Sequence, residues 1–144
     1  MARRMAEAAR RPPPLEADAL VPVPLHAVRL RERSFNHAAE LADAVGRLTG
    51  IPVLHHLLLR TRPTAAQAQL DARARRQNVE HAFAVRGAAS SCRSRWQPDS
   101  VTLPEASVVL VDDVITTGAT VRACAKALKA AGAARVGVLA FAHG

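Results

Sequence analysis

The stretch VVLVDDVITTGAT, residues 108–120, joins an apolar run to two adjacent acids and a threonine-rich turn. A continuous apolar run of this kind is typical of a strand buried on both faces of a parallel sheet. Apolar residues then recur at helical spacing and predict a helix that ends at Gly132. They are Val121, Cys124, Ala125 and Leu128. A strand, a tight loop and a helix in this order predict that the acids and threonines lie at the carboxyl edge of the sheet, where open α/β folds bind ligands.

Further strand signals lie on both sides of this stretch. An apolar run beginning at Ala19 is ended by Pro22 and Pro24, because proline cannot donate to a strand ladder. The other predicted strands are a buried one at residues 52–59, a short one in AFAVR at residues 82–86 and a final one in RVGVLAFA at residues 135–142.

Helix and loop signals separate these strands. Residues 37–49 fit a helix that Asn36 can cap at its start and Gly50 at its end. Its predicted apolar face consists of Ala38, Leu41, Ala42, Val45 and Leu48. The polar stretch at residues 60–78 predicts a mobile loop leading into a short helix, and residues 87–106 predict a surface excursion. The alternation predicts an α/β domain with a mostly parallel sheet of about five strands, flanked by helices.

The chain has 144 residues, which suggests one domain. Residues 1–18 are basic and then proline-rich, and they predict a flexible amino-terminal tail or a short helix before a domain at residues 19–144. The tail lacks the apolar core of a signal peptide, so a cytoplasmic protein is expected. No apolar run is long enough to cross a membrane.

The formal net charge of +8 is compatible with nucleic acid, with a phosphate-rich small ligand, or simply with an arginine-rich composition. Aromatic residues make up only 3%, which disfavours a stacking platform for single-stranded bases. The two cysteines do not form a CxxC pair, and the adjacent residues His55 and His56 would point to opposite faces of a strand. No metal site built from protein ligands is therefore predicted.

The quoted stretch suits a sugar phosphate. Residues 116–120 would surround the amino end of a helix, where free N–H groups and the helix dipole favour an anion. Gly118 allows close approach of the backbone, and the threonine hydroxyls add donors. Ionised Asp112 and Asp113 accept hydrogen bonds only, and the vicinal hydroxyls of a ribose can donate them. A ribose 5-phosphate would satisfy both halves.

Three other interpretations compete. A Walker B strand requires a GxxxxGK[ST] loop, and none of the seven glycines is followed by lysine. A two-acid magnesium or phosphoacceptor site leaves the threonine loop unexplained. A purely structural turn does not account for adjacent acids followed by TTGAT.

Residues 108–120 resemble the phosphoribosyl pyrophosphate (PRPP) signature of type I phosphoribosyltransferases. VPVPLHAVRLRERSFNHAAELA resembles the PVPLH…RGFNQ segment of the ComF-like group, named for competence for DNA uptake. RTRPTAAQAQLDARARRQNVEHAF resembles its Q-x-x-L…R-x-x-N…AF segment, with matches at Gln67, Leu70, Arg75, Asn78 and Phe83. Ser34 replaces the glycine of the family pattern, and the group's amino-terminal zinc-binding cysteine cluster has no counterpart in these residues.

The resemblance implies a type I phosphoribosyltransferase fold and a set of site residues. Asp112 and Asp113 would hold the ribose hydroxyls and, with Arg75, carry the catalysis. The 5-phosphate would be held by Thr116, Thr117, Gly118, Ala119 and Thr120. The pyrophosphate would be held by Arg29, Arg31 and Arg33. Residues 60–78 would fold over the site, and Mg²⁺ would be bound mainly through PRPP rather than by protein ligands.

The implied activity is transfer of the phosphoribosyl group from PRPP to an unidentified base or amine, with release of pyrophosphate. The alternative is a non-catalytic PRPP-binding accessory or regulatory protein linked to competence and DNA uptake. A third interpretation is a nucleic-acid binder with a vestigial sugar site, which the intact acidic pair disfavours. Contact with DNA is expected to be weak or indirect, and a homodimer is left open.

Overall fold

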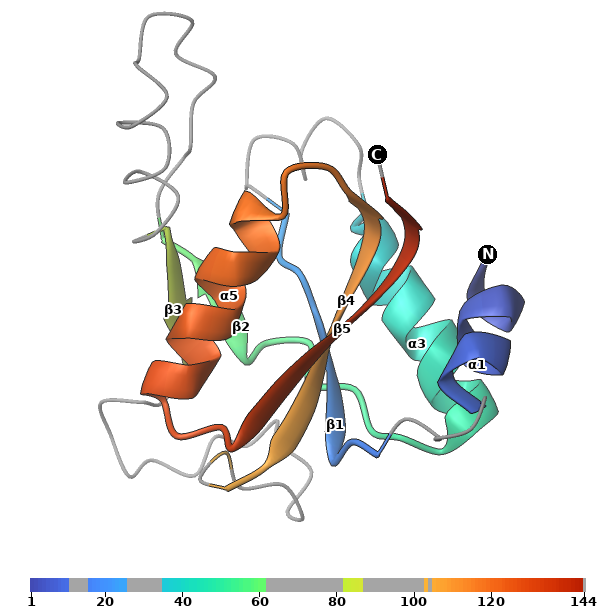
Figure 1. The fold of residues 1–144 in the computed structure, drawn as a ribbon, viewed down its shortest axis with the longest axis horizontal. Coiled ribbons are helices and arrows are strands. Elements are labelled where there is room, and N and C mark those ends of the chain that lie inside the picture. The colour runs from blue at the N-terminus through green and yellow to red at the C-terminus, as the bar shows by residue number, and fades with distance from the viewer. Residues whose placement is uncertain (11–15, 26–34, 62–81, 87–102, 104, 144) are drawn as a thin grey trace, which may run out of the picture.

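The computed structural model describes residues 1–10, 16–25, 35–61, 82–86, 103 and 105–143 (Figure 1). Its helices are α1 (Ala2–Arg10), α3 (His37–Thr49) and α5 (Ala119–Ala130). Its strands are β1 (Ala19–Pro22), β2 (Leu58–Arg60), β3 (Phe83–Val85), β4 (Ser107–Ile115) and β5 (Arg135–His143).

The main sheet is parallel, with the order β1-β4-β5. β4 is its central strand, and Val108, Val109, Leu110 and Val111 are all buried. A parallel bridge from Leu20 to Val53 extends the sheet beyond β1, where Leu20 N donates to Pro52 O at 2.8 Å. The predicted α/β class with a parallel sheet is confirmed.

The prediction of a buried strand at residues 52–59 is wrong. Only the segment around Val53 joins the sheet; a turn follows at His55 and His56, and β2 then pairs antiparallel with β3 in a separate ribbon. Both histidines are exposed, and His55 Nε2 lies 2.7 Å from Asp43 Oδ1 on α3. A buried strand would have to desolvate at least one imidazole, which is costly without a partner. In the described residues the main sheet therefore has three strands and one bridge, and the other two of the five strands form the separate β2-β3 ribbon.

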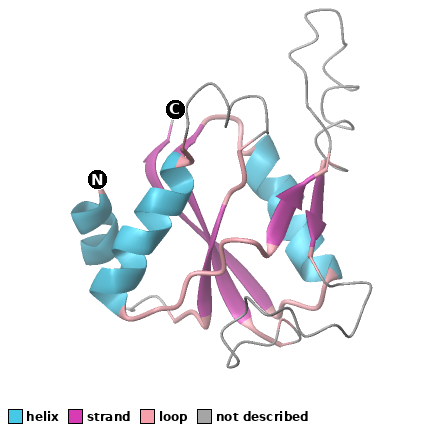
Figure 2. Cartoon of the chain, turned by 180° about the vertical axis from the view of Figure 1, so that it is seen from behind, coloured by secondary structure: helices cyan, strands magenta, loops and turns pink. Residues whose placement is uncertain are grey.

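The helices cover both faces of this sheet, with α5 on one side and α3 with α1 on the other (Figures 1 and 2). Alternate residues of β4 point to the two sides. Val108 and Leu110 belong to a core cluster that includes Cys124 and Leu128 of α5. Val109 and Val111 belong to a second cluster that includes residues of α3 and α1. The sheet is thus the middle of three layers.

α3 begins and ends where the sequence predicts. Asn36 Oδ1 accepts a hydrogen bond from Ala38 N at 3.1 Å, and Gly50 adopts the left-handed conformation at φ 78°. The predicted apolar face is buried at Ala38, Leu41, Ala42 and Val45. Leu48 is an exception, because its side chain is 41% exposed.

The predicted apolar stripe of α5 is confirmed. Val121, Cys124 and Leu128 are buried, and Ala125 is half-buried. β3 lies within its predicted segment, and β5 extends one residue beyond the predicted residues 135–142, to His143. The predicted surface excursion at residues 87–106 falls largely outside the described residues.

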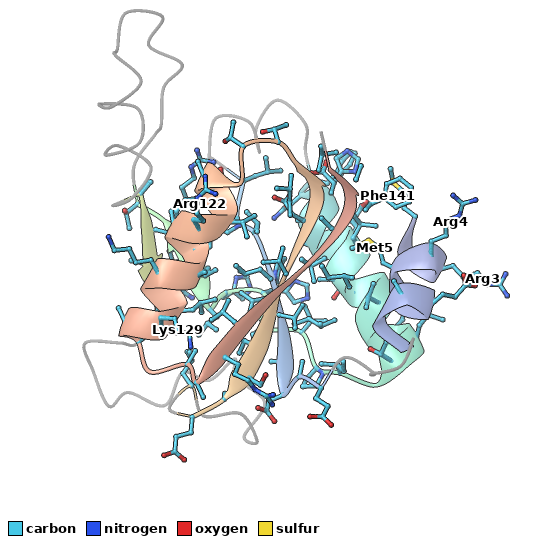
Figure 3. All side chains as sticks on the ribbon, viewed as in Figure 1. Arg3, Arg4, Met5, Arg122, Lys129 and Phe141 are labelled. Carbon is cyan, nitrogen blue, oxygen red and sulfur yellow. The ribbon has the colours of Figure 1, made fainter. Side chains whose placement is uncertain are left out.

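The predicted flexible tail contains a packed helix. Met5 of α1 is only 2% exposed and joins the core cluster of Leu41 and Val109 (Figure 3). Arg3 and Arg4 point away from the body, so α1 is amphipathic and buries its apolar side. Residues 2–10 are therefore the short helix of the two alternatives and not a flexible tail, and the domain boundary at residue 18 stays a prediction.

Gly46 marks a close approach of α3 to the 51–53 segment. A Cβ at Gly46 would lie 2.8 Å from Val53 Cγ2 and 2.9 Å from Ile51 O. Glycine-to-alanine changes inside helices normally stabilise a protein. Here we expect Gly46→Ala to destabilise by about 1–3 kcal/mol, since overpacking forces the backbone to move. Urea unfolding measures this, with Arg47→Ala as the exposed neighbouring control; a Gly46→Ala protein as stable as wild type would contradict the packing described.

Candidate functional site

The acidic pair lies near the carboxyl end of β4, at the edge of the sheet. The strand continues through Asp112 and Asp113 to Ile115, because β5 runs beside it and pairs Asp112 with Ala140. The sequence pattern predicted that the acids follow the strand, whereas in the structure both acids are part of β4 itself, near its carboxyl end. Their predicted location at the carboxyl edge is confirmed, since β1, β4 and β5 are parallel.

Each carboxylate turns one oxygen back toward the chain. Asp113 N donates to Asp112 Oδ1 at 2.9 Å, and Val114 N donates to Asp113 Oδ1 at 2.8 Å. Within the described ranges, no hydrogen bond reaches either Oδ2. Both side chains are half-buried, so the second oxygens can accept hydrogen bonds from a ligand with hydroxyl donors.

Burial raises the pKa of Asp112 from 3.8 to about 6. The backbone N–H of Asp113 opposes this effect by stabilising the carboxylate, whereas the neighbouring Asp113 carboxyl group reinforces it. A pKa of about 6 leaves Asp112 mainly ionised at neutral pH, and therefore able to accept but not to donate.

The threonine loop leads directly into α5. Thr116 and Thr117 are exposed, and Gly118 is the amino-terminal cap in the left-handed conformation, with φ 70°. Gly118 has no side chain to cap this helix end, and Ala119 N donates a long hydrogen bond to Thr117 Oγ1, at 3.4 Å. The first amides of a helix have no acceptor within the helix, so this end of α5 offers N–H groups to an anion.

Arg122 adds a cation that the sequence motif does not include. Its Nη2 donates to Thr117 O at 2.8 Å from the first turn of α5 (Figure 3). The signal in the sequence was its position four residues after Gly118, which places both residues on one face of a helical turn.

Cys124 lies beneath the site as a core residue. Burial raises the pKa of its thiol to about 12; the charge of Asp112 adds to the effect and that of Arg60 opposes it. The side chain is fully buried, which confirms the prediction of a small core residue. Arg60 ends β2, and its guanidinium carbon lies 5.4 Å from the centre of the Phe83 ring on β3.

Several predicted site residues lie outside the described ranges. They are Arg29, Arg31, Arg33 and Arg75. The stretch predicted to fold over the site, residues 60–78, is described only at Arg60 and Thr61. Thr61 N donates to Ala82 O at 2.8 Å, so the described residues on either side of positions 62–81 lie side by side.

The acidic pair is the feature of the site that suits a divalent cation. Mg²⁺ usually takes one or two carboxylates and completes its shell with water and ligand phosphates. Among the residues described here, no three His, Cys, Asp or Glu side chains gather into a metal-binding group. The donor set therefore fits a magnesium ion that arrives with a phosphate ligand.

None of the described helices is long and apolar enough to cross a membrane.

The raised pKa of Asp112 has a consequence for stability. A carboxyl group whose pKa is higher in the folded state contributes stability below pH 3.8 and loses it as the pH rises through about 6. We expect Asp112→Asn to unfold at higher urea than wild type at about pH 7.5, by on the order of 1 kcal/mol after allowance for partial exposure.

This difference between Asp112→Asn and wild type should disappear near pH 4, where both side chains are neutral. Urea unfolding across this pH range is the measurement, and Glu7→Gln, which removes an exposed carboxylate on α1, is the control. A stability difference that does not change with pH would contradict the burial argument.

Three comparisons with known proteins agree with this geometry. The family described as phosphoribosyl transferase domain matches residues 63–144, more than half of the chain. Competence protein F of Haemophilus influenzae is 34% identical over 126 residues, which are 88% of this chain and 50% of that protein. DNA utilization protein YhgH of Escherichia coli (strain K12) is 34% identical over 121 residues, 84% of this chain and 47% of that protein. The chain thus spans about half the length of the curated relatives it matches.

Two solved structures share the fold. The glutamine phosphoribosylpyrophosphate amidotransferase from B. subtilis, complexed with ADP and GMP, superposes with a TM-score of 0.54 at 22% identity, covering 95% of this chain and 25% of that one. An allosteric regulatory enzyme of purine biosynthesis superposes with a TM-score of 0.55 at 23% identity, covering 96% and 25%. The domain match, the ComF-like relatives and the acid–threonine motif at the end of β4 together show that this chain belongs to the phosphoribosyl transferase domain family, within its ComF-like group.

Proposed function

We propose that this chain binds PRPP with Mg²⁺ at the carboxyl edge of its sheet and transfers the phosphoribosyl group to a nitrogen acceptor, with release of pyrophosphate. One observation carries the proposal: a pair of half-buried carboxylates at the end of β4 lies directly before the amino-terminal end of α5, in a chain of the phosphoribosyl transferase domain family. The first feature suits sugar hydroxyls and the second suits a phosphate.

Asp112 and Asp113 take the ribose. Each has one oxygen held by a backbone amide, which fixes the rotation of the carboxylate and leaves Oδ2 for a hydroxyl donor. Fixed carboxylates lose little freedom on binding, so more of the hydrogen-bond energy appears as affinity. The same negative charges lie where the ribose ring gains positive charge during the reaction, and a fixed opposite charge stabilises such a transition state.

The loop of Thr116–Thr120 takes the 5-phosphate through its amides and hydroxyls. With ribose and phosphate both anchored, the reacting carbon is held in one place while the bond to pyrophosphate breaks and the bond to nitrogen forms. Anchoring of this kind lowers the entropic part of the barrier. No covalent protein intermediate is needed, since the acceptor nitrogen supplies the electron pair.

The departing pyrophosphate carries concentrated negative charge. Arg29, Arg31, Arg33 and Arg75 are proposed to stabilise it, by the resemblance of their segments to the ComF-like group. Mg²⁺, when bound with PRPP, neutralises part of the same charge. Residues 60–78 are proposed to exclude water from the reaction, since water would otherwise compete with the acceptor.

A second candidate function rests on the names of the relatives. Competence protein F and DNA utilization protein YhgH point to DNA uptake, which a PRPP-binding accessory or regulatory protein would also fit. The two candidates differ in turnover. Incubation with Mg²⁺, PRPP and a panel of nucleobases and amines should release pyrophosphate under the first and should not under the second. Under either function, we also propose that the protein is cytoplasmic and forms a homodimer.

The carboxylates should bind hydroxyls through their charge. A hydrogen bond to a charged group contributes roughly 1.5–3 kcal/mol. We therefore expect Asp113→Asn to weaken binding of PRPP and of ribose 5-phosphate by about tenfold or more, and the Asp112→Asn, Asp113→Asn double variant to lose more. Calorimetric titration in the presence of Mg²⁺ measures both ligands.

Inorganic phosphate provides the matched control for the acid variants, because it contacts only the threonine loop. Its affinity should be unchanged in the double Asn variant. Thr117→Val should instead weaken both inorganic phosphate and ribose 5-phosphate. If the double variant binds PRPP as tightly as wild type, the sugar-site assignment is wrong and the enzyme proposal fails with it.

Basic charge in this chain is proposed to serve phosphate ligands rather than DNA. Any DNA binding should be weak. The logarithm of its binding constant should fall linearly with the logarithm of the salt concentration, since the binding rests on release of counterions. Fluorescence anisotropy with labelled duplexes of different sequence tests this. Tight, sequence-selective binding at about 0.15 M salt that PRPP does not affect would overturn the assignment.

A further inference from the structure

The turn before α5 has a defined backbone geometry. Gly118 has φ 70° and ψ 6°, the values of the third residue in a type II turn. A type I′ turn would also need a positive φ at Thr117, and Thr117 does not have one. Residues 116–118 form a bend, and the left-handed backbone at Gly118 is one in which a glycine is at ease.

Arg122 lies over the central peptide of this turn. Its Nη2 donates to Thr117 O at 2.8 Å, and its backbone N donates to Gly118 O at 2.9 Å. A Cβ built on Gly118 would lie 3.4 Å from Arg122 Nη1, so the guanidinium group lies next to the side of the glycine where a side chain would project. One side chain thus covers the Thr117–Gly118 peptide.

A trans peptide is planar, and its C=O and N–H point in opposite directions. Because Thr117 O faces the guanidinium group, the Gly118 N–H must point away from it, to the other side of the loop. If this peptide rotated through about half a turn, as the central peptide does between type I and type II turns, a carbonyl oxygen would occupy the place of the N–H and would repel an anion there.

We propose that Arg122 is a positioning residue, which holds the Thr117–Gly118 peptide in the orientation that presents the Gly118 N–H to the 5-phosphate. This inference rests on the proposed function, because it assigns a role within the same phosphate loop. Gly118 permits both orientations of the peptide, whereas the hydrogen bond from Arg122 selects one of them. The charge of Arg122 is directed to the carbonyl, so its main effect on the phosphate passes through the backbone.

The test is a double-mutant cycle on phosphate binding. Inorganic phosphate and ribose 5-phosphate are titrated into wild type, Arg122→Gln, Gly118→Ala and the double variant. Arg122→Gln should weaken both ligands by about tenfold, as expected for loss of one hydrogen bond from a charged group. Gly118→Ala should weaken them similarly, since a positive φ disfavours alanine. The double variant should bind each ligand about as tightly as whichever single variant binds it less tightly. The two losses should not add, because both changes release the same peptide.

Two controls separate positioning from charge and from folding. Arg47→Gln removes an equal charge in the last turn of α3 and should leave both affinities unchanged. The ratio of the ribose 5-phosphate affinity to the phosphate affinity should be the same in Arg122→Gln as in wild type, because the ribose contacts are untouched. Thermal unfolding should show that Arg122→Gln melts within about 2 °C of wild type, as expected for an exposed substitution.

The outcomes distinguish the two proposals. A wild-type protein that binds neither ligand overturns the proposed function. A wild-type protein that binds both, together with an Arg122→Gln variant of unchanged affinity, overturns the positioning role and leaves the proposed function standing. Strictly additive losses in the cycle would also overturn the positioning role, since they would mean that Arg122 acts through its charge alone.

Discussion

Burial of β4 between its two neighbours is the constraint on which the rest of the structure depends. Val108 and Leu110 pack toward α5, while Val109 and Val111 pack toward α3 and α1, so one four-residue run joins both core clusters. Its parallel pairing with β1 and β5 places three strand ends at one edge. The acids that follow are therefore fixed by the same burial that stabilises the fold, and α5 must begin where the strand emerges.

The parts of the fold that could be predicted from sequence are those set by local signals. Asn36 and Gly50 bound α3 at the expected residues, because a side-chain cap and a left-handed glycine act within one turn. β2 was missed because an apolar run cannot reveal that His55 turns outward to meet Asp43 on α3. The packing of helix α1 could not be predicted, because Met5 gains its burial from residues such as Leu41, far along the chain.

The candidate site divides in the same way. Asp112, Asp113 and the threonine loop were predictable because their residue types and order alone specify donors and acceptors. For Arg122 the sequence indicates only the position, four residues after Gly118; its hydrogen bond to Thr117 O depends on the direction of one peptide plane, which no sequence pattern encodes. The pKa of Asp112 was equally out of reach, because it depends on how deeply the end of β4 is buried.

Asp112 exposes a conflict between stability and the proposed chemistry. Burial raises the pKa of its carboxyl group, so the fold favours the protonated form, whereas a sugar hydroxyl is best bound by the ionised form. An asparagine at this position would remove the cost of burying a charge, but it could not offer an ionised carboxylate to a sugar hydroxyl. The hydrogen bond from Asp113 N to Asp112 reduces this conflict, because it stabilises the ionised form from within the strand. A residue that costs stability at neutral pH but keeps its charge near a ligand edge is what a functional site is expected to retain.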